Sequence, residues 1–155
     1  DPDADADAFI EWVAPLMPTD RAASTGIIRV ENHSMTDTDY ASVSLCNPAS
    51  NRAVGQAVGQ PLSQQRWRGN LWVDGLAPWE EFDWVGRDIQ IGGAHFHVHE
   101  PITRCRATMA NPETGRIDAN TLGALNDTWG HQHFGVYLKC IQGGEIATGD
   151  TVEVL

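Results

Sequence analysis

The feature that most constrains the fold of this 155-residue chain is a succession of short apolar segments, each closed by glycine, proline, asparagine or aspartate. The clearest of them, residues 94–99, alternates histidine with alanine, phenylalanine and valine. Such strict alternation is typical of a β-strand with two different faces. Many short strands with frequent turn signals favour a barrel or a sandwich. We therefore expect one mainly β domain, and the length suits a single domain.

The other expected strands follow from the same pattern of short apolar runs between turn residues. They are residues 26–30, 39–45, 71–73, 88–91, 102–109, 134–141 and 151–155. The acidic, low-complexity opening, residues 1–8, is expected to be a disordered tail.

Two segments carry the signals of a helix. Asn47 is a typical N-cap and Pro48 a typical first helical residue, so a helix should begin there and run to Val58. The glycine and proline that follow would end it. A second helix is expected at residues 118–129, because its leucines and the closing tryptophan fall on one face.

The formal net charge of −11 is unevenly distributed. Residues 1–40 carry nine acidic and two basic side chains, whereas the rest of the chain carries twelve acidic and eight basic ones. An acidic chain argues against a general nucleic-acid or anionic-membrane partner, because both need a basic face. It does not exclude a small anionic ligand, because local charge decides such binding. Nine of the ten basic residues are arginines, which suit bidentate recognition of phosphate or carboxylate.

Compartment can be argued from the cysteines and from the absence of targeting signals. Three cysteines do not suggest a disulfide framework, so a reducing cytoplasm is the expected location. The sequence shows no apolar run long enough to span a bilayer and no signal peptide.

The first candidate binding motif lies between residues 66 and 70. Arg66 and Arg68 have no acidic neighbour in the sequence, so they make a local positive spot. Gly69 would let a ligand approach the backbone, and Asn70 can both donate and accept hydrogen bonds. The motif therefore suggests a clamp for phosphate or carboxylate. The alternative is a surface loop whose arginines pair with the acidic residues at 80–83.

The second candidate motif is Cys105 between Arg104 and Arg106. Nearby cations favour the thiolate, which is both a nucleophile and a metal ligand. On a straight strand, however, the two arginines would point to the face opposite the cysteine. The alternative is a buried, unreactive cysteine, and this is also how we interpret Cys46 and Cys140.

Histidines form the third candidate site. His95, His97 and His99 share one face of the expected strand, and His131 and His133 form a second pair with the same spacing. Histidines spaced in this way can bind zinc, copper or non-haem iron. Local spacing alone completes no ligand set, so the alternative is the polar face of an edge strand.

Taken together and in order, the motifs resemble the MOSC domain, the C-terminal domain of molybdenum cofactor sulfurases. The family also includes the mitochondrial amidoxime reducing component and stand-alone bacterial proteins, and this chain resembles the stand-alone type. We expect residues 1–25 to be an acidic lead-in and residues 26–155 to be the MOSC domain. The matching motifs are Val43-Ser44-Leu45, Ala49-Ser50, residues 66–70, Trp79-Glu80, Trp84-Val85-Gly86, Arg104-Cys105, Thr108, residues 111–115, residues 134–137 and Gly149-Asp150.

The resemblance implies a closed β-barrel similar to the β-domain of pyruvate kinase, with two or three short helices. It also implies binding of the molybdenum cofactor, a molybdopterin, and a link to sulfur transfer. Cys105 matches the cysteine that ligates molybdenum in the amidoxime-reducing relatives, and Arg68 and Asn70 match the stretch that contacts the pterin and phosphate. The expected site residues are Cys105 as catalytic residue and molybdenum ligand, and, for cofactor binding, Arg66, Arg68, Asn70, Arg104 and Ser50.

The resemblance leaves the activity open between two alternatives. One is an oxidoreductase that uses the molybdenum cofactor to reduce N-hydroxylated compounds, with electrons from separate redox proteins. The other is a sulfur carrier or transferase, in which Cys105 takes a persulfide from a cysteine desulfurase. Pyridoxal phosphate is expected only in fused family members. Those members also carry an extra N-terminal β-barrel domain that supplies part of the cofactor grip. Here we expect either that the cofactor is held less completely, or that a partner or a second copy in a homodimer closes the site.

Overall fold

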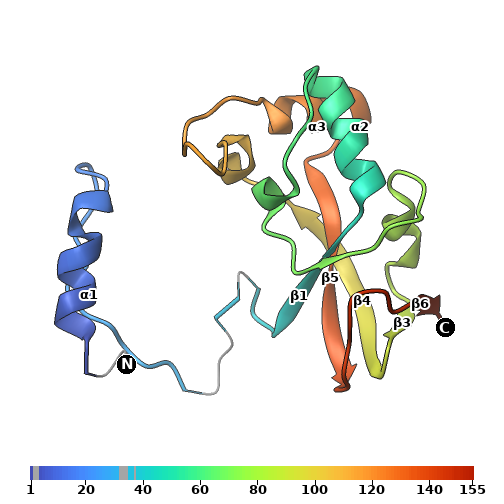
Figure 1. The fold of residues 1–155 in the computed structure, drawn as a ribbon, viewed down its shortest axis with the longest axis horizontal. Coiled ribbons are helices and arrows are strands. Elements are labelled where there is room, and N and C mark those ends of the chain that lie inside the picture. The colour runs from blue at the N-terminus through green and yellow to red at the C-terminus, as the bar shows by residue number, and fades with distance from the viewer. Residues whose placement is uncertain (2–3, 32–34, 37) are drawn as a thin grey trace. The chain divides into compact units, whose positions relative to one another are not determined.

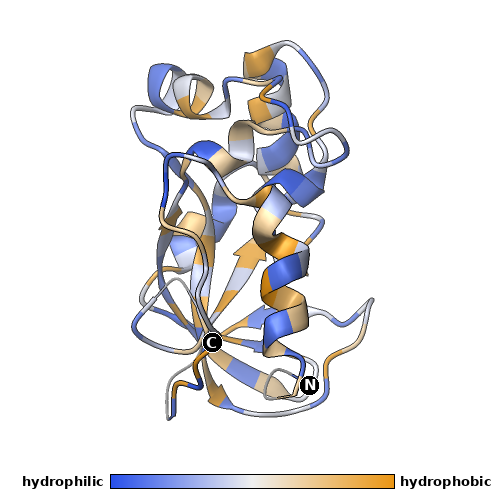
Figure 2. Cartoon of the chain, turned by 90° about the vertical axis from the view of Figure 1, so that its left-hand side faces the viewer, coloured by the Kyte–Doolittle hydropathy of each residue, from blue (hydrophilic) through white to orange (hydrophobic). Residues whose placement is uncertain are grey.

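The computed structural model describes residues 1, 4–31, 35–36 and 38–155. The chain divides into two compact units, residues 1–33 and 34–155. In the first unit, α1 (Ala6–Val13) begins within residues 1–8, the segment expected to be a disordered tail, and a short 3-10 turn, η1 (Ala14–Leu16), follows it. Hydrophobic and hydrophilic residues are mixed along α1, and none of its residues is buried (Figure 2). Residues 26–30, expected to be a strand, have no regular secondary structure.

One curled sheet of six strands forms the second unit (Figure 1). Its strands are β1 (Ser42–Cys46), β2 (Leu71–Trp72), β3 (Asp88–Ile91), β4 (Ala94–Thr103), β5 (His133–Gln142) and β6 (Val152–Val154). Their order is β2-β1-β5-β4-β3-β6, and every neighbouring pair is antiparallel except β1 with β2.

The sheet is an open half-barrel, so the closed barrel expected from the resemblance is not confirmed. Among the described residues, the two edge strands, β2 and β6, do not pair with each other. They are only two and three residues long, so they offer few backbone groups with which a barrel could close. The mainly β class is confirmed.

The prediction of a strand at residues 102–109 is confirmed only for its first two residues and is wrong for the rest. β4 ends at Thr103, its last partner on β5 is His133, and the register shifts just before this pair. Residues 106–109 instead form a 3-10 turn, η4. The change matters because Cys105 lies between the strand and this turn.

The helix at residues 48–58 is confirmed as α2 (Pro48–Val58). Its first turn is capped because the side chain of Asn47 accepts a hydrogen bond from the backbone N–H of Ala49 at 2.8 Å. It ends where Gly59 adopts a left-handed conformation with φ of 84°. The second expected helix is α3 (Thr121–Trp129), which begins three residues later than predicted. Among the described residues, no helix has the length and hydrophobicity needed to cross a bilayer.

Two apolar clusters hold the second unit together. The larger one lies along the sheet and includes Leu45, Ile89 and Val98, all fully buried. The other lies under α2 and α3, which pack together at one end of the sheet (Figure 1). At its centre, the rings of Trp67 and Phe134 stack with their centroids 3.7 Å apart. The 3-10 turn η2 (Gln64–Trp67) contributes Trp67 to this second cluster, whereas the 3-10 turn η3 (Glu80–Trp84) contributes Trp84 to the first one.

Candidate functional site

A pocket of about 370 Å³ lies beside the C-terminal end of β4 and the end of η2. Its walls include Arg66, Arg68 and Asn70 from one sequence motif, and Arg104 and Cys105 from the other. The fold thus brings together five of the six residues that the resemblance placed at the cofactor. Sequence reasoning missed the hydroxyl-bearing part of the lining: Thr36, Ser42, Ser44, Thr103, Thr108 and Tyr137.

Arg66 is buried in the wall of this pocket. Its guanidinium donates to the carbonyl oxygen of Met109 at 3.2 Å and pairs with the carboxylate of Asp118, not with the acidic residues at 80–83. Hydrogen bonds from Asn111 and Arg66 lower the pKa of Asp118, so this carboxylate stays charged. The Nε atom of Arg66 is buried and has no hydrogen-bond partner among the described residues. A buried donor without a partner costs about 1–3 kcal/mol, so Arg66 is suited to an acceptor from a ligand.

Arg68 is the exposed cation of the pocket. It has a left-handed backbone with φ of 51° and forms no ion pair with any described residue. The next residue must be small, because a Cβ on Gly69 would lie 2.8 Å from the Sγ atom of Cys46. Close packing against the protein, rather than a ligand, therefore explains this glycine.

Asn70 presents its amide in a fixed orientation. Its Oδ1 atom accepts hydrogen bonds from the backbone N–H and the hydroxyl of Ser44, at 2.9 and 2.8 Å. The Nδ2 group has no acceptor among the described residues, so it is available as a donor to a ligand in the pocket.

Arg104 directs three of its donors into the protein. It bonds to the carbonyl oxygens of Phe134 and Trp67 at 2.9 and 2.8 Å, and to the Sγ atom of Cys46 at 3.6 Å. Burial lowers the pKa of Arg104, and its nearby thiols oppose that shift. No sequence pattern around Arg104 indicates this inward orientation.

Cys105 has an exposed side chain at the edge of the pocket. On a straight strand, the arginines on either side of Cys105 would point to the opposite face. β4 has already ended at Thr103, so this argument does not apply here. Arg106 is exposed but does not line the pocket. The other cysteines differ: Cys46 is buried, as expected, and burial raises the pKa of its thiol to about 11. Cys140 is exposed on β5, so its interpretation as a buried residue is wrong.

Ser50 is the one predicted cofactor-binding residue that does not line the pocket. Its buried hydroxyl donates to Glu81 at 2.9 Å and accepts from the backbone N–H of Trp79 at 2.9 Å. Asn47 donates to the same carboxylate at 2.8 Å. Burial raises the pKa of Glu81, while these hydrogen bonds oppose the shift. The network fastens η3 to α2.

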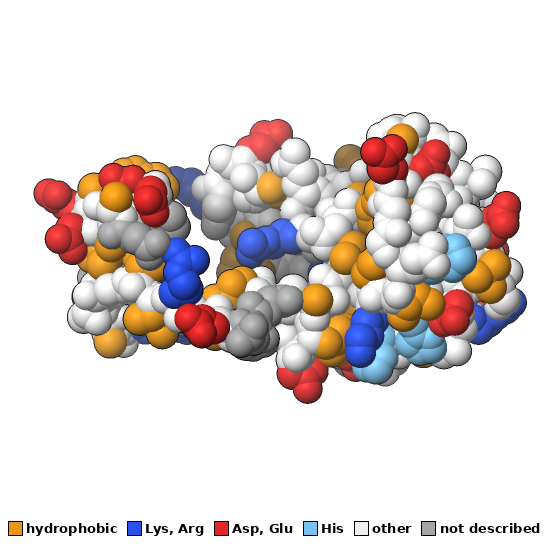
Figure 3. Space-filling view, turned by 90° about the horizontal axis from the view of Figure 1, so that it is seen from below, with side chains coloured by type: hydrophobic (Ala, Val, Ile, Leu, Met, Phe, Trp, Pro, Cys, Tyr) orange, Lys and Arg blue, Asp and Glu red, His pale blue; other side chains and the backbone are white. Residues whose placement is uncertain are grey.

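The histidines of β4 do not converge on a metal site. His97 contacts Asp88 at 2.7 Å, and the ring of His99 packs edge-on against Tyr40. Figure 3 shows histidine side chains gathered on one face beside acidic and basic ones. In the part of the chain that the structure describes, no three His, Cys, Asp or Glu side chains could hold a metal ion together. His131 and His133 stack on each other with their centroids 5.2 Å apart.

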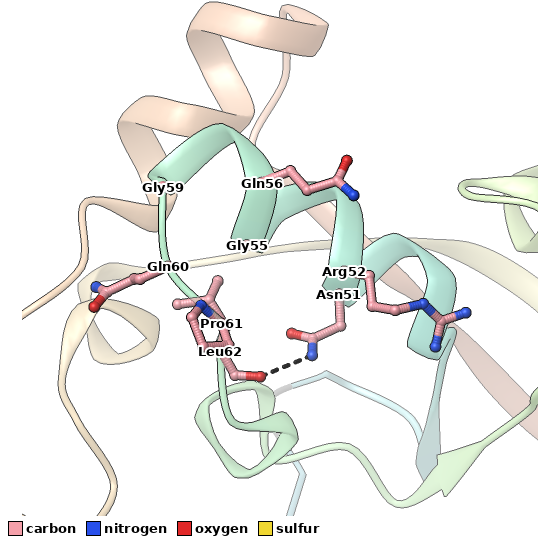
Figure 4. A pocket seen from close by; sticks show the side chains of 8 residues that line it. All are labelled: Asn51, Arg52, Gly55, Gln56, Gly59, Gln60, Pro61 and Leu62. Carbon is pink, nitrogen blue, oxygen red and sulfur yellow. Dashed lines mark hydrogen bonds between the residues drawn. The ribbon is translucent and has the colours of Figure 1, made fainter.

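A second cavity, of about 420 Å³, runs along α2 (Figure 4). One polar group of its wall already has a partner, because Asn51 donates to the carbonyl oxygen of Leu62 at 2.9 Å. Its glycine is explained by packing, because a Cβ on Gly55 would lie 3.0 Å from the carbonyl oxygen of Gln60. The pocket at the two motifs is therefore the better candidate for a functional site.

Comparison with known proteins gives one family. The sequence profile of the MOSC domain matches residues 32–153. The chain is 40% identical over 75 residues to molybdenum cofactor sulfurase of Anopheles gambiae, covering 48% of this chain and 10% of the relative. It is 29% identical over 136 residues to molybdenum cofactor sulfurase of Drosophila willistoni, covering 79% of this chain and 17% of the relative. Molybdenum cofactor sulfurase 2 of Culex quinquefasciatus is 28% identical over 156 residues, covering 88% of this chain and 20% of the relative.

The chain thus spans a fifth or less of the length of these curated relatives. A solved structure, YiiM from Geobacillus stearothermophilus, has a similar fold with a TM-score of 0.54 and 18% sequence identity. The likeness covers 73% of this chain and 53% of that one. At this identity it supports the fold alone.

Proposed function

The chain belongs to the MOSC domain family, and on that premise we propose that it binds the molybdenum cofactor in the pocket beside Cys105. The relatives named molybdenum cofactor sulfurase support the choice of ligand. The observation that carries the proposal is the unpartnered, buried Nε of Arg66 in the wall of a pocket that also holds the unpaired Arg68.

The residues present fit an anionic pterin cofactor. The pocket volume of about 370 Å³ is in the range of small-molecule sites. Arg66 and Arg68 would hold the anionic groups through charge-assisted hydrogen bonds. The free amide of Asn70 would donate to an acceptor on the ring system. Cys105 would offer a thiolate, which is a suitable soft ligand for molybdenum.

A bound cofactor would supply redox chemistry at the metal, and reduction of N-hydroxylated compounds is the reaction that we propose for it. This chain's own residues would bind and orient the cofactor and leave the side of Cys105 open to the solvent. Electrons would come from a separate redox protein.

Expression in a host that makes the cofactor tests this proposal. Molybdenum and pterin would be measured per chain in the purified protein by mass spectrometry and by fluorescence of the oxidised pterin. We expect both in the wild type and a loss of at least about tenfold in Arg68→Gln, because one charge-assisted contact contributes about 1.5–3 kcal/mol. Arg52→Gln, which removes an arginine from the cavity along α2, is the matched control and should keep both. A wild-type protein without molybdenum would contradict the proposal.

The exposure of Cys105 favours a second candidate, a sulfur carrier. Its thiolate would attack the outer sulfur of a persulfide on a cysteine desulfurase. A new S–S bond would form on Cys105, and the donor's cysteine would leave as a thiolate, so that no external oxidant is needed. The three free cysteines of the chain agree with a reducing, cytoplasmic location for this chemistry.

Incubation with a cysteine desulfurase and cysteine, followed by mass spectrometry of peptides, tests the carrier role. We expect one added sulfur atom on the peptide that contains Cys105. Cys140 is an internal control, because it is exposed but lies on β5, outside the pocket. Equal labelling of both cysteines would show that accessibility alone governs the reaction.

A further inference from the structure

Arg104 is held by acceptors from three separate parts of the second unit. These are the carbonyl oxygen of Phe134 at the start of β5, that of Trp67 at the end of η2, and the Sγ atom of Cys46 at the end of β1. Three of its five N–H bonds are therefore used inside the protein. A guanidinium with this many fixed partners has one orientation.

Stacked aromatic rings fix the same guanidinium from one side. Its central carbon lies 5.8 Å from the ring centroid of Trp67 and 5.7 Å from that of Phe134. Both distances are within the range of a cation–π interaction. The rings are fully buried, so they form a rigid support under this wall of the pocket.

The bond to the carbonyl oxygen of Trp67 bears directly on Arg68, the next residue. Arg68 has φ of 51° and ψ of 36°, a left-handed conformation that is strained for a non-glycine residue. Such a conformation persists only where the surroundings hold it. On one side, the N–H of Arg68 donates to the carbonyl oxygen of Gln65 at 3.2 Å. On the other, Arg104 fixes the carbonyl group of the peptide that joins Trp67 to Arg68.

The thiol of Cys46 connects this arrangement to the rest of the turn. It accepts from Arg104, and it lies so close to Gly69 that no Cβ would fit there. The segment from Trp67 to Gly69 is thus held by a buried thiol and a half-buried guanidinium.

We infer that Arg104 is a positioning residue, which holds Arg68 in the conformation that places its side chain at the pocket. The inference rests on the proposed function only for the anionic character of the ligand. Arg68 is then the residue that binds the ligand. The ends of β1, β4 and β5 set the conformation of Arg68 through their contacts with Arg104.

A double-mutant cycle with inorganic phosphate as the probe tests this role. Phosphate affinity would be measured by titration calorimetry for the wild type, Arg104→Lys, Arg68→Gln and the double variant. Arg104→Lys keeps the positive charge but cannot reach all three acceptors. We expect it to weaken binding about tenfold, as Arg68→Gln does, and we expect the double variant to bind no more weakly than Arg68→Gln alone. Losses that add in the double variant would make Arg104 a direct ligand and overturn the inference.

Arg106→Gln is the matched control, because this neighbouring arginine is exposed and does not line the pocket. It should leave phosphate binding within about twofold of the wild type.

A crystal structure of Arg104→Lys provides a readout that needs no ligand. We expect the backbone of residue 68 to leave the left-handed region and its side chain to leave the pocket. If φ stays near the 51° of the wild type, the inference is wrong. A wild-type protein that does not bind phosphate would count against the proposed function, while this structure would still decide the role of Arg104.

Discussion

The two ends of β4 both carry residues that could take part in chemistry, but among the described residues only those at the C-terminal end line a pocket. At the N-terminal end, His95, His97 and His99 follow a strand face, and the rings of the last two are 6.1 Å apart. At the C-terminal end, the strand stops at Thr103, and Cys105 meets side chains from η2 and β1 in one cavity. A regular strand keeps side chains of one face parallel and apart, whereas the end of a strand lets distant segments meet.

The side chains at the two ends of β4 also differ in their interaction partners. The histidines interact with nearby groups on the surface, such as Asp88 for His97. Arg104 interacts with main-chain oxygens and a thiol that belong to three other segments. We therefore expect substitutions at the C-terminal end to affect stability and binding together, and substitutions at the histidines to affect neither.

The largest effect is expected for Phe134→Ala, which removes the ring layer under the C-terminal end. Phe134 is fully buried and stacks on Trp67, so the substitution should lower the free energy of unfolding by about 3–5 kcal/mol. Urea denaturation measures this loss. Phe9→Ala, at a phenylalanine that is 50% exposed, is the control and should change it by less than about 0.5 kcal/mol. A loss below about 1 kcal/mol in Phe134→Ala would mean that the rings do not support the pocket.

The next effect is expected for Gly69→Ala. The new Cβ would meet the Sγ atom of Cys46 at 2.8 Å and the ring of Trp72 at 3.0 Å, so we expect a loss of about 1–3 kcal/mol. In a Cys46→Ala background the same substitution should cost less, because one of the two contacts is gone. Thermal or urea denaturation of the four proteins measures this coupling. Gly143→Ala, where nothing lies within 4 Å of the added atom, is the control. Equal losses in both backgrounds would refute the close contact.

A third prediction concerns the buried network of Ser50, Asn47 and Glu81, which lies outside the lining of the pocket. Because burial raises the pKa of Glu81 in the folded protein, the folded state binds more protons than the unfolded state just above the unfolded pKa. The free energy of unfolding should therefore fall as the pH rises through the window between the two pKa values. A single group contributes at most about 1.4 kcal/mol per pH unit.

Glu81→Gln should remove this component. Urea denaturation from pH 4 to pH 8 would show it as a difference between the wild type and the variant. Asp83→Asn, an exposed acid in the same turn, is the control. A pH profile that is unchanged in Glu81→Gln would show that this carboxyl group titrates normally.

The smallest effect is expected at the histidine end of β4. Replacing His95, His97 and His99 together by Gln should change the free energy of unfolding by less than about 1 kcal/mol, because the contact of His97 with Asp88 is partly exposed to solvent. The metal content of the protein should not change, and elemental analysis measures it. Loss of a bound metal in this variant would show that the histidine end of β4 is a metal site, contrary to the comparison of the two ends.

The elements with strong local signals could be predicted from the sequence. α2 was predicted to the residue because both of its ends carry their own signals, Asn47 and Gly59. α3 starts late because Asn120 caps it, while Asp118 instead pairs with Arg66 from a distant segment. The end of β4 could not be predicted, because the side chain of Arg104 turns inward to acceptors on other segments.

For the candidate site, the sequence motifs and the family resemblance were sufficient to choose residues but not to assign their geometry. Arg68 and Cys105 could be chosen because their motifs are distinctive. The inward orientation of Arg104 and the burial of Ser50 against Glu81 depend on contacts between segments far apart in the chain. The serines of β1 could have been found, because they alternate with Val43 and Leu45, and such alternation places them together on one face.

The most direct test of the account is a crystal structure of protein purified from a host that makes the molybdenum cofactor, with anomalous data collected at the molybdenum edge. We predict one anomalous peak at bonding distance from the Sγ atom of Cys105, with density for the pterin against Arg66, Arg68 and Asn70. An anomalous peak beside the histidines of β4 would contradict the assignment of this pocket as the cofactor site. So would the absence of a peak at Cys105 in a crystal that contains stoichiometric molybdenum.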